Sequence, residues 1–435
     1  QHGIINLNGC KLIDTLQQIF EDCEISGYFY DYKGRAEWFG AKNDLSNDCL
    51  SSFNQVTKIA NRIVLSGKYK FSDTWEIIDK QGYSIESEFN QNITFSENKN
   101  DFKVLLDFDD VPTDHDGLKI NGFVGVTLKD FAVSYYRGEK GGTSNTSNAA
   151  VRIFKGHDYN ISGLRINATH WGNTAGLILG NNNGELCAFL GVIEDVKVLC
   201  HSSSIGIGTF GGNTSLNFRS CYVAGGGYYH IEGTVYSSFL NCACDGATYY
   251  GYLITSNVYY NATNLSFISC GSESCGKSGF WISDYVQNID FLNPYDANNN
   301  TLGGSGDGSL FMFAPNTWAK NVKITNPSSY TNNGTYSFVF NGDLDNIWVE
   351  STNKKNIKKG FGGGSLNKVS ITGDFELMPL TPTIEGATVT TINEILGFWK
   401  KVGDGYEIFI LIDGDFTTTS GSSFIQLPFN VGRGI

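Results

Sequence analysis

Two carboxylates, Asp245 and Glu273, stand at equivalent places after two similar strand-like runs. When runs 237–244 and 264–272 are aligned, each carboxylate is the next residue of its run. If the runs are neighbouring parallel strands, the two carboxyl groups lie about 5 Å apart. Repulsion at that distance raises the pKa of one group, and such a pair suits general acid–base chemistry. The alternative is structural, because Asp245 and Gly246 also form a favourable turn dipeptide.

A third carboxylate, Glu232, ends the aromatic-rich run YYHIE at 228–232. Asp284 falls close to the equivalent point two repeats later, beside Trp281 and Tyr285. Few other charges share the face of Glu232, which favours a role in chemistry over that of a solvated strand residue. For the surrounding residues, ordinary surface positions are the competing interpretation. We predict Glu232, Asp245 and Glu273 as catalytic residues, and as substrate-binding residues Tyr228, Tyr229, His230, Trp281, Asp284 and Tyr285.

These residues must be held by strands, because the sequence is rich in Gly (52 of 435 residues) and aromatics (14%) but poor in charge (17%). From about residue 104, short strand-like runs repeat at intervals of 21 to 33 residues with a mean of 27. A degenerate repeat of this length is typical of a solenoid. Leucine-rich repeats and propellers have other consensus patterns or longer units. The predicted equivalent residues are Leu128, Ile161, Ile193, Phe218, Phe239, Phe267, Phe291, Ile324, Val349 and Ile371.

The fold predicted from this repeat is all-β: a right-handed, single-stranded parallel β-helix. Equivalent positions would then stack along the axis at the strand spacing. Cysteines at one position of three coils should form an interior stack, and Ile231, Ile254 and Ile282 should point inward, which turns Glu232 outward. Polar residues expected at the preceding corner are Ser220, Asn241, Ser269 and Asn293. The cysteines of the interior stack are Cys221, Cys242 and Cys270.

The two ends of the chain differ from the repeat. Helical spacing within 38–71 predicts one short helix with Asp48 as its N-cap. After residue 378, runs 396–412 and 422–429 predict a small antiparallel β region. We therefore divide the chain into an N-terminal segment (1–37), a β-helix (38–378) and a C-terminal β subdomain (379–435). The chain starts at Gln1, and we expect it to be cut from something longer. The region after residue 378 is either a small capping subdomain or a truncated C-terminal domain.

Composition excludes several classes of protein. A net charge of −13 and a pI near 4.9 disfavour nucleic acid as a partner. No apolar run approaches the length of a membrane helix, so no membrane insertion is expected. The motif G-x-G-x-x-G at 206–211 has no helix after it, and the acidic stretch at 107–116 has no EF-hand pattern, so we predict neither cofactor nor metal. The only basic cluster is Lys354, Lys355, Lys358 and Lys359.

The opener W-F-G-A-K at 38–42, a short helix and the strand V-L-x-G-x-Y at 64–69 resemble the entry of the pectate-lyase-like β-helix superfamily. The coil F-L-N-C-A-C-D-G at 239–246 and the closing I-Q-L-P-F at 425–429 resemble bacteriophage tailspikes that depolymerise bacterial capsule or exopolysaccharide. The resemblance covers 38–372. One departure is Leu45, where the family usually has Gly in a turn.

The resemblance implies a homotrimer in the virion tail, made in the host cytoplasm and attached to the tail or baseplate through an absent N-terminal anchor. It also implies endo-cleavage of a bacterial capsular or surface polysaccharide. Hydrolysis needs one carboxylic acid and a second carboxylate, which the predicted residues supply, and aromatic rings beside them suit sugar faces. Two alternatives remain. A polysaccharide lyase would use His230 or a tyrosine as base, and an adhesin would bind without cleavage.

Overall fold

The computed structural model describes most of the chain up to residue 350 and separate strands after it. From 351 on, and for Glu24, Asp110, Tyr136, Arg137, His170, Ser329 and Tyr330, only the backbone is described. The described residues are 4–8, 15–21, 23–27, 33–90, 96, 98–112, 115–137, 148–170, 174–181, 187–201, 204–299, 301, 309–330, 338–350, 359–361, 369–372, 375–377, 383–385, 387–402, 405–418 and 424–426.

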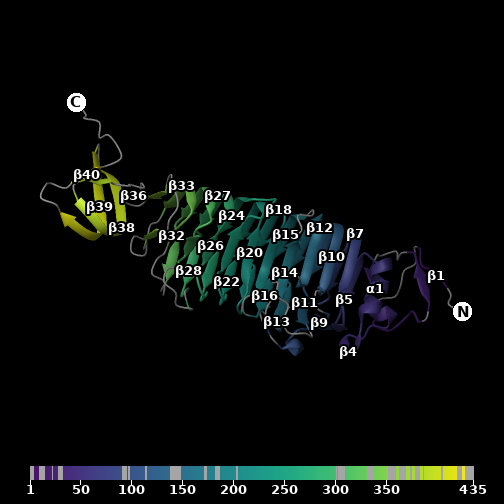
Figure 1. Ribbon diagram of the computed structural model, residues 1–435. Helices are drawn as coiled ribbons and strands as arrows, with labels where there is room; N and C mark the ends of the chain where they lie inside the picture. Colours follow the sequence, from purple (N-terminus) through teal and green to yellow (C-terminus); the bar gives the residue numbers. More distant parts are fainter. Residues whose placement is uncertain are drawn as a thin grey trace.

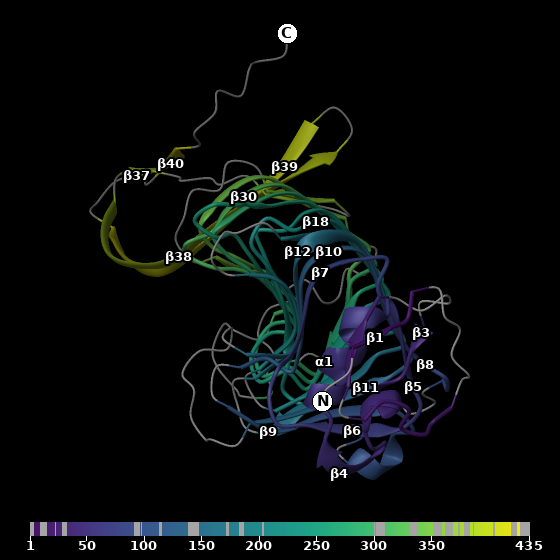
Figure 2. The same cartoon turned by 90° about the vertical axis from the view of Figure 1, so that its right-hand side faces the viewer.

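The chain winds into coils whose strands form three faces, and each strand pairs in parallel with its equivalent in the next coil (Figure 1). Figure 2 looks along this stack and shows the strands of successive coils superposed. Strands β10 (Leu118–Lys129) and β12 (Ala149–Ser162) run through the corner between the first and second faces. The remaining first-face strands are β7 (Trp75–Gln81), β14 (Ala175–Gly180), β17 (Ile205–Phe210), β20 (Tyr228–Glu232), β23 (Tyr252–Thr255), β26 (Phe280–Ile282), β29 (Phe311–Phe313), β32 (Phe338–Phe340) and β34 (Lys359–Phe361).

The second and third faces continue each coil. The second face has β3 (Lys33–Gly34), β5 (Arg62–Leu65), β8 (Ser84–Ser87), β15 (Ala188–Glu194), β18 (Thr214–Arg219), β21 (Val235–Leu240), β24 (Ala262–Ile268), β27 (Tyr285–Leu292), β30 (Trp318–Thr325), β33 (Asp343–Glu350) and β35 (Val369–Thr372). The third face has β4 (Asp44–Asp48), β6 (Lys68–Phe71), β9 (Leu105–Val111), β11 (Ala132–Arg137), β13 (Arg165–His170), β16 (Lys197–Cys200), β19 (Tyr222–Ala224), β22 (Ala243–Asp245), β25 (Gly271–Glu273), β28 (Tyr295–Ala297) and β31 (Ser328–Tyr330).

The predicted parallel β-helix is confirmed, and so is the alignment of its coils. Leu128 pairs with Ile161, and the same row continues without a shift through every predicted equivalent position to Ile371. The row also extends toward the N-terminus through Ile85 and Ile63. The inward direction of one residue in each coil therefore fixes the inward direction of all of them.

Aromatic rings stack along the axis inside the solenoid. Phe239 lies 4.5 Å from Phe218 and 4.7 Å from Phe267 between ring centroids, with interplanar angles of 3° and 6°. A second stack, behind the first face, contains Tyr229 and Tyr252 at 4.6 Å. Tyr229 is fully buried there, so its assignment as a substrate-binding residue was wrong.

The predicted cysteine stack is confirmed, since Cys221, Cys242 and Cys270 are all buried. All nine cysteines of the described residues are free thiols. The thiol of Cys221 lies 3.4 Å from the Ile193 carbonyl oxygen, and that of Cys270 lies 3.3 Å from the Phe239 carbonyl oxygen. These cysteines act as small apolar residues that also satisfy strand carbonyl groups.

The corner between the second and third faces uses a left-handed residue in coil after coil. Ser220, Asn241, Ser269 and Asn293 have φ values of 51° or 52°, as expected for the polar corner positions. A second left-handed row crosses the second face, where side-chain amides bond from coil to coil at 2.8 to 3.2 Å. Its members are Asn264, Asn288, Asn321 and Asn346.

The N-terminal end of the core is closed by helix α1 (Leu50–Ile59) and the 3₁₀ turn η1 (Ala36–Phe39) (Figures 1 and 2). Phe53 of α1 contacts the rings of Tyr69 and Trp75 at centroid distances of 5.0 and 4.7 Å. Asp48 accepts from the Leu50 amide at 3.1 Å, although Cys49 is the residue at the N-cap position itself. The expected helix is therefore confirmed, with its cap one residue later.

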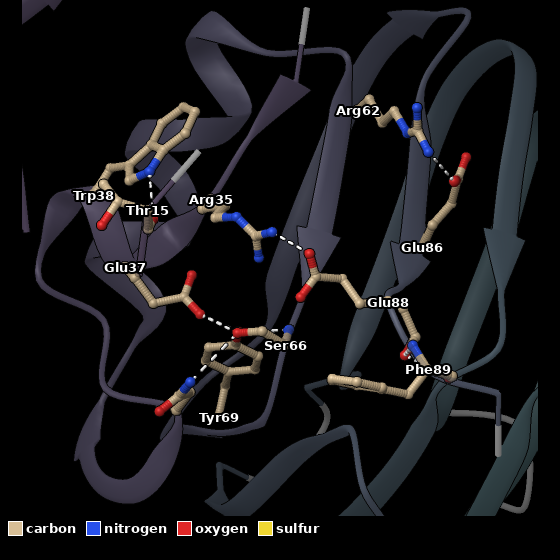
Figure 3. Close-up of polar contacts among 12 residues, drawn as sticks. Thr15, Arg35, Glu37, Trp38, Arg62, Ser66, Tyr69, Glu86, Glu88 and Phe89 are labelled. Atoms are coloured by element: carbon tan, nitrogen blue, oxygen red, sulfur yellow. Dashed lines mark hydrogen bonds and ion pairs between the residues drawn. The ribbon is translucent and has the colours of Figure 1, made fainter. Parts of the chain in front are cut away.

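Beneath this cap lies a buried carboxylate. Glu37 accepts hydrogen bonds from the Ser66 and Tyr69 hydroxyl groups at 2.5 and 2.6 Å, and Arg35 forms an ion pair with Glu88 (Figure 3). Burial, together with the adjacent Glu37, raises the pKa of Tyr69, which keeps its hydroxyl a donor. This network connects the segment around η1 to the first coils.

Beyond residue 372 the pairing changes from parallel to antiparallel. β36 (Phe375–Leu377) pairs with β35, β38 (Ala387–Val402) with β39 (Gly405–Thr418), and β37 (Thr383–Glu385) with β40 (Phe424–Gln426). The expected antiparallel region is thus confirmed, whereas Pro379 and Pro382, taken as the break, lie outside the described residues. The short elements β1 (Ile4–Asn6), β2 (Glu24–Ser26) and η2 (Lys99–Asp101) complete the structure. Among the described residues, none of the helices has the length and apolarity needed to span a bilayer.

The aromatic stack predicts a large stability cost for one truncation. Replacing Phe239 with Ala removes a ring stacked on both sides, and we expect a loss of about 3–5 kcal/mol in the free energy of unfolding. Chemical denaturation measures it. The control is Tyr236→Ala in the same strand, because the Tyr236 side chain is 67% exposed and its loss should cost less than about 0.5 kcal/mol. Equal losses in the two variants would contradict the stacking argument.

Leu45 provides a second test. It has a φ of 67° within a bulge of β4, the conformation that the glycine of the resembled family would adopt without strain. We expect Leu45→Gly to be at least as stable as the wild type, and Leu45→Val to lose about 1 kcal/mol, because a β-branched residue tolerates this region poorly. Thermal unfolding of both variants decides. A more stable Val variant would refute the explanation.

Candidate active site

The outer corner between the first and second faces gathers three of the predicted site residues. Glu232 ends β20, Asp284 lies between β26 and β27, and Tyr285 begins β27. Glu232 pairs in register with Thr255, whose hydroxyl donates to Asp284 at 2.6 Å. One threonine therefore bridges the coil of Glu232 and the coil of Asp284.

The carboxyl group of Glu232 is largely shielded from solvent. Its side chain is 19% exposed. Burial raises its pKa, the negative charge of Asp284 raises it further, and the Asn257 side chain opposes the shift. Asn257 and Tyr260 lie over Gly233, where an added Cβ would be 3.2 Å from the Asn257 amide nitrogen and 3.0 Å from the Tyr260 Cβ.

His230 lies two residues before Glu232 on the same outward side of β20, with 13% of its side chain exposed. Its ring makes an edge contact with Phe210 at 4.8 Å and stacks on Tyr228 at 5.9 Å. Burial lowers the pKa of His230 to about 4, so the ring is neutral at pH 7. Its Nε2 is 3.5 Å from Glu232, and Nδ1 has no hydrogen-bond partner among the described residues. Such a ring helps to position Glu232 and removes water from one side of it.

Asp284 is held by hydrogen bonds on both oxygens. Oδ2 accepts from the hydroxyl groups of Thr255 and Ser283, at 2.6 and 3.2 Å, and Oδ1 accepts from the Asn316 amide at 2.8 Å. Its backbone has a φ of 57°, in the left-handed region. These bonds hold the carboxylate in one orientation at the corner.

Aromatic rings border the two carboxylates. Tyr285 is 56% exposed and lies 5.6 Å from the ring of Trp318, its register partner in the next coil. Tyr259 and Tyr260 are exposed on the loop that follows β23. A corner with carboxylates and exposed rings can stack on the faces of a sugar chain while acids reach its linkages.

The other predicted carboxylate pair lies on the third face. Asp245 and Glu273 are register partners on β22 and β25, as the sequence alignment expected. The Tyr222 hydroxyl donates to Asp245 at 3.3 Å, and burial together with Asp245 raises the pKa of Tyr222 to about 12. This pair and Glu232 belong to different faces, so the structure does not unite the three predicted catalytic residues in one site.

Trp281 is on the outer side of the first face, with its ring 4.4 Å from that of Tyr250. Tyr228 is half-buried on the same side of β20 and packs against apolar residues of β14 and β17. Both rings therefore line the outside of the first face, between the two carboxylate pairs.

Some residues of the site were missed by sequence reasoning. Trp318 could have been found by extending the alignment of run 321–329 three residues backward, where it meets Tyr285. Asn257, Tyr260 and Asn316 lie in corner loops of unequal length, which carry no periodic signal. Among the described residues, no group of three or more His, Cys, Asp or Glu side chains is arranged to hold a metal ion.

Comparisons with known proteins support the fold. No protein-family model and no curated protein matches the chain. The enzymatically active domain of tailspike protein 2 from bacteriophage CBA120 superposes with a TM-score of 0.53 at 13% identity, over 84% of this chain and 56% of that one. Full-length tailspike protein 2 from an Escherichia coli O157:H7 bacteriophage gives 0.51 at 11% identity, over 91% and 62%. The chain thus spans about three fifths of the length of these two proteins, and its fold is similar to theirs.

Proposed function

We propose that the protein is an endo-acting depolymerase that hydrolyses glycosidic bonds of a bacterial capsular or surface polysaccharide. The observation that carries the proposal is the pairing of Glu232 with Asp284. Glu232 has a pKa raised by burial, which suits a general acid, and Asp284 is oriented by hydrogen bonds, which suits a general base. The surrounding rings supply the stacking surface that a sugar chain requires.

Glu232 and Asp284 are two coils apart, about 10 Å between their backbones at the strand spacing. The hydrogen bond from Thr255 holds the Asp284 carboxylate beside the coil that lies between them. Glu232 would protonate the leaving oxygen while Asp284, as the base, activates the attacking water.

The fold shared with phage tailspikes supports a place in a virion tail, and a homotrimer is part of the proposal. The lyase alternative is less well supported, because the pKa of its candidate base, His230, is lowered to about 4, which makes the ring a weak base. A tyrosine base remains the other form of that alternative. A non-catalytic adhesin would use the same aromatic corner without cleavage.

The proposed acid–base pair predicts a loss of activity in two variants. Glu232→Gln and Asp284→Asn should each reduce depolymerisation by about 10²–10⁴-fold, because each removes one member of the acid–base pair. The measurement is polymer size and reducing ends after incubation with a panel of purified capsules.

The matched control is Asp245→Asn, which alters the other carboxylate pair and should keep most of the activity. The opposite pattern would move catalysis to Asp245 and Glu273. Absorbance near 235 nm would indicate a lyase, and binding without any loss of polymer length would indicate an adhesin.

The raised pKa of Glu232 also predicts a pH-dependent change in stability. Because burial raises the pKa of Glu232 above its usual 4.5, its contribution to stability is fully present below that pH and is lost as the pH rises through the folded-state pKa. Glu232→Gln should therefore have a higher Tm than the wild type at pH 7, and the gap should shrink as the pH falls toward 4.5. Thermal unfolding from pH 4 to 8 tests this. If the difference in Tm does not change with pH, the charged form of Glu232 does not destabilise the folded protein.

A further inference from the structure

A hollow of about 750 Å³ opens at the corner between the first and second faces, on the N-terminal coils. This volume is in the range of small-molecule sites. The side chains that matter for its chemistry are Lys80, Val124, Lys155, His157 and Phe189. None of them belongs to the carboxylate site described above.

One wall of the hollow is formed by side chains that stack along the axis. Val124, His157 and Phe189 are register partners on three successive coils. The rings of His157 and Phe189 stack at 5.1 Å with an interplanar angle of 22°. Gly156 precedes this wall, and a Cβ there would lie 2.4 Å from the Phe123 ring, so the site has no room for a side chain. The wall thus consists of a stacked ring pair next to Gly156, where the backbone carries no side chain.

Two lysines line the hollow within an acidic chain. Lys80 and Lys155 both line it, against the single carboxylate of Asp79. The Lys80 ammonium donates to the Thr57 carbonyl oxygen at 2.7 Å, which fixes its position. His157 Nδ1 is 2.8 Å from Asp158, which holds that carboxylate beside the ring. Since the whole protein carries −13, two lysines gathered at one hollow favour an anionic ligand.

The hollow is aligned with the carboxylate site. Phe189, Thr214 and Val235 form one row through successive coils, and Val235 is three residues after Glu232. The aromatic wall is therefore two coils, about 10 Å along the axis, from the coil that carries Glu232. A polymer that follows this corner would pass both places.

We propose that this hollow is a binding subsite for an acidic sugar unit of the polysaccharide chain that is cleaved at Glu232 and Asp284. The sugar ring would lie against the side chains of His157 and Phe189, and its carboxylate would lie between Lys80 and Lys155. The inference rests on the proposed function and adds to it a substrate class, an acidic polysaccharide, and a direction of the chain along the solenoid axis.

The test measures binding apart from cleavage. Glu232→Gln protein is titrated with fluorescently labelled acidic capsules from the same panel, and with the same polymers after chemical reduction of their carboxyl groups to alcohols. We expect tight binding of at least one acidic polymer and at least tenfold weaker binding of its reduced form. Adding Lys155→Glu or Phe189→Ala should also weaken binding of the acidic polymer by about tenfold or more.

The matched control is Lys323→Glu, a charge reversal on the exposed side of β30, which should leave binding unchanged. Lys155→Gln serves if Lys155→Glu does not fold, as judged by thermal unfolding. Equal binding of native and reduced polymers, loss of binding in the Lys323 variant to the same degree, or no binding of any acidic capsule would overturn the inference. If capsules are cleaved equally well before and after reduction of their carboxyl groups, the proposed function stands and the subsite does not. If binding depends on Lys155 but no capsule is cleaved, the subsite stands without the proposed function.

Discussion

Stacking at the strand spacing of about 4.8 Å is the constraint on which the rest of this protein depends. A coil of some 27 residues cannot bury its inward side chains alone, and only the coils above and below it complete the cover. Each inward position must therefore accept a similar residue in the next coil, as in the continuous row from Leu128 to Ile371. The same rule orders the outward side chains of the strands, which lie in rows with one residue from each coil.

The candidate active site uses this order in an uneven way. Glu232 lies beside a neutral His230, whose ring packs against Phe210 and Tyr228, whereas Asp284 receives three hydrogen bonds. Two carboxylates of one corner thus have different environments, and difference of environment is what separates an acid from a base. A buried carboxylate lowers stability at neutral pH, and the interdigitated core on the other side of β20 offsets that loss.

Sequence periodicity was enough to predict the coils, because burial acts on every inward residue in the same way. It also contained the information needed to avoid the error at Tyr229. This residue lies two positions before Ile231, so it shares the inward parity of that isoleucine, yet its aromatic type suggested a surface role. The loops at the corners obey no period, which is why Asn257 and Asn316 were not foreseen. Likewise, the alignment could pair Asp245 with Glu273. It could not show which of the predicted carboxylates is shielded from water, because that shielding depends on loops packed over the corner.

The buried cysteines have a consequence for the chemistry of the folded protein. Eight of the nine cysteines in the described residues are buried, and burial raises the pKa of Cys200 to about 12. A thiol in that state is almost entirely protonated at neutral pH and reacts slowly with alkylating or oxidising reagents. Modification of these thiols would therefore proceed at the rate at which individual coils open. The cysteines spread from the cap at Cys49 to Cys275, so they form a built-in set of reporters that can reveal which end of the solenoid loosens first.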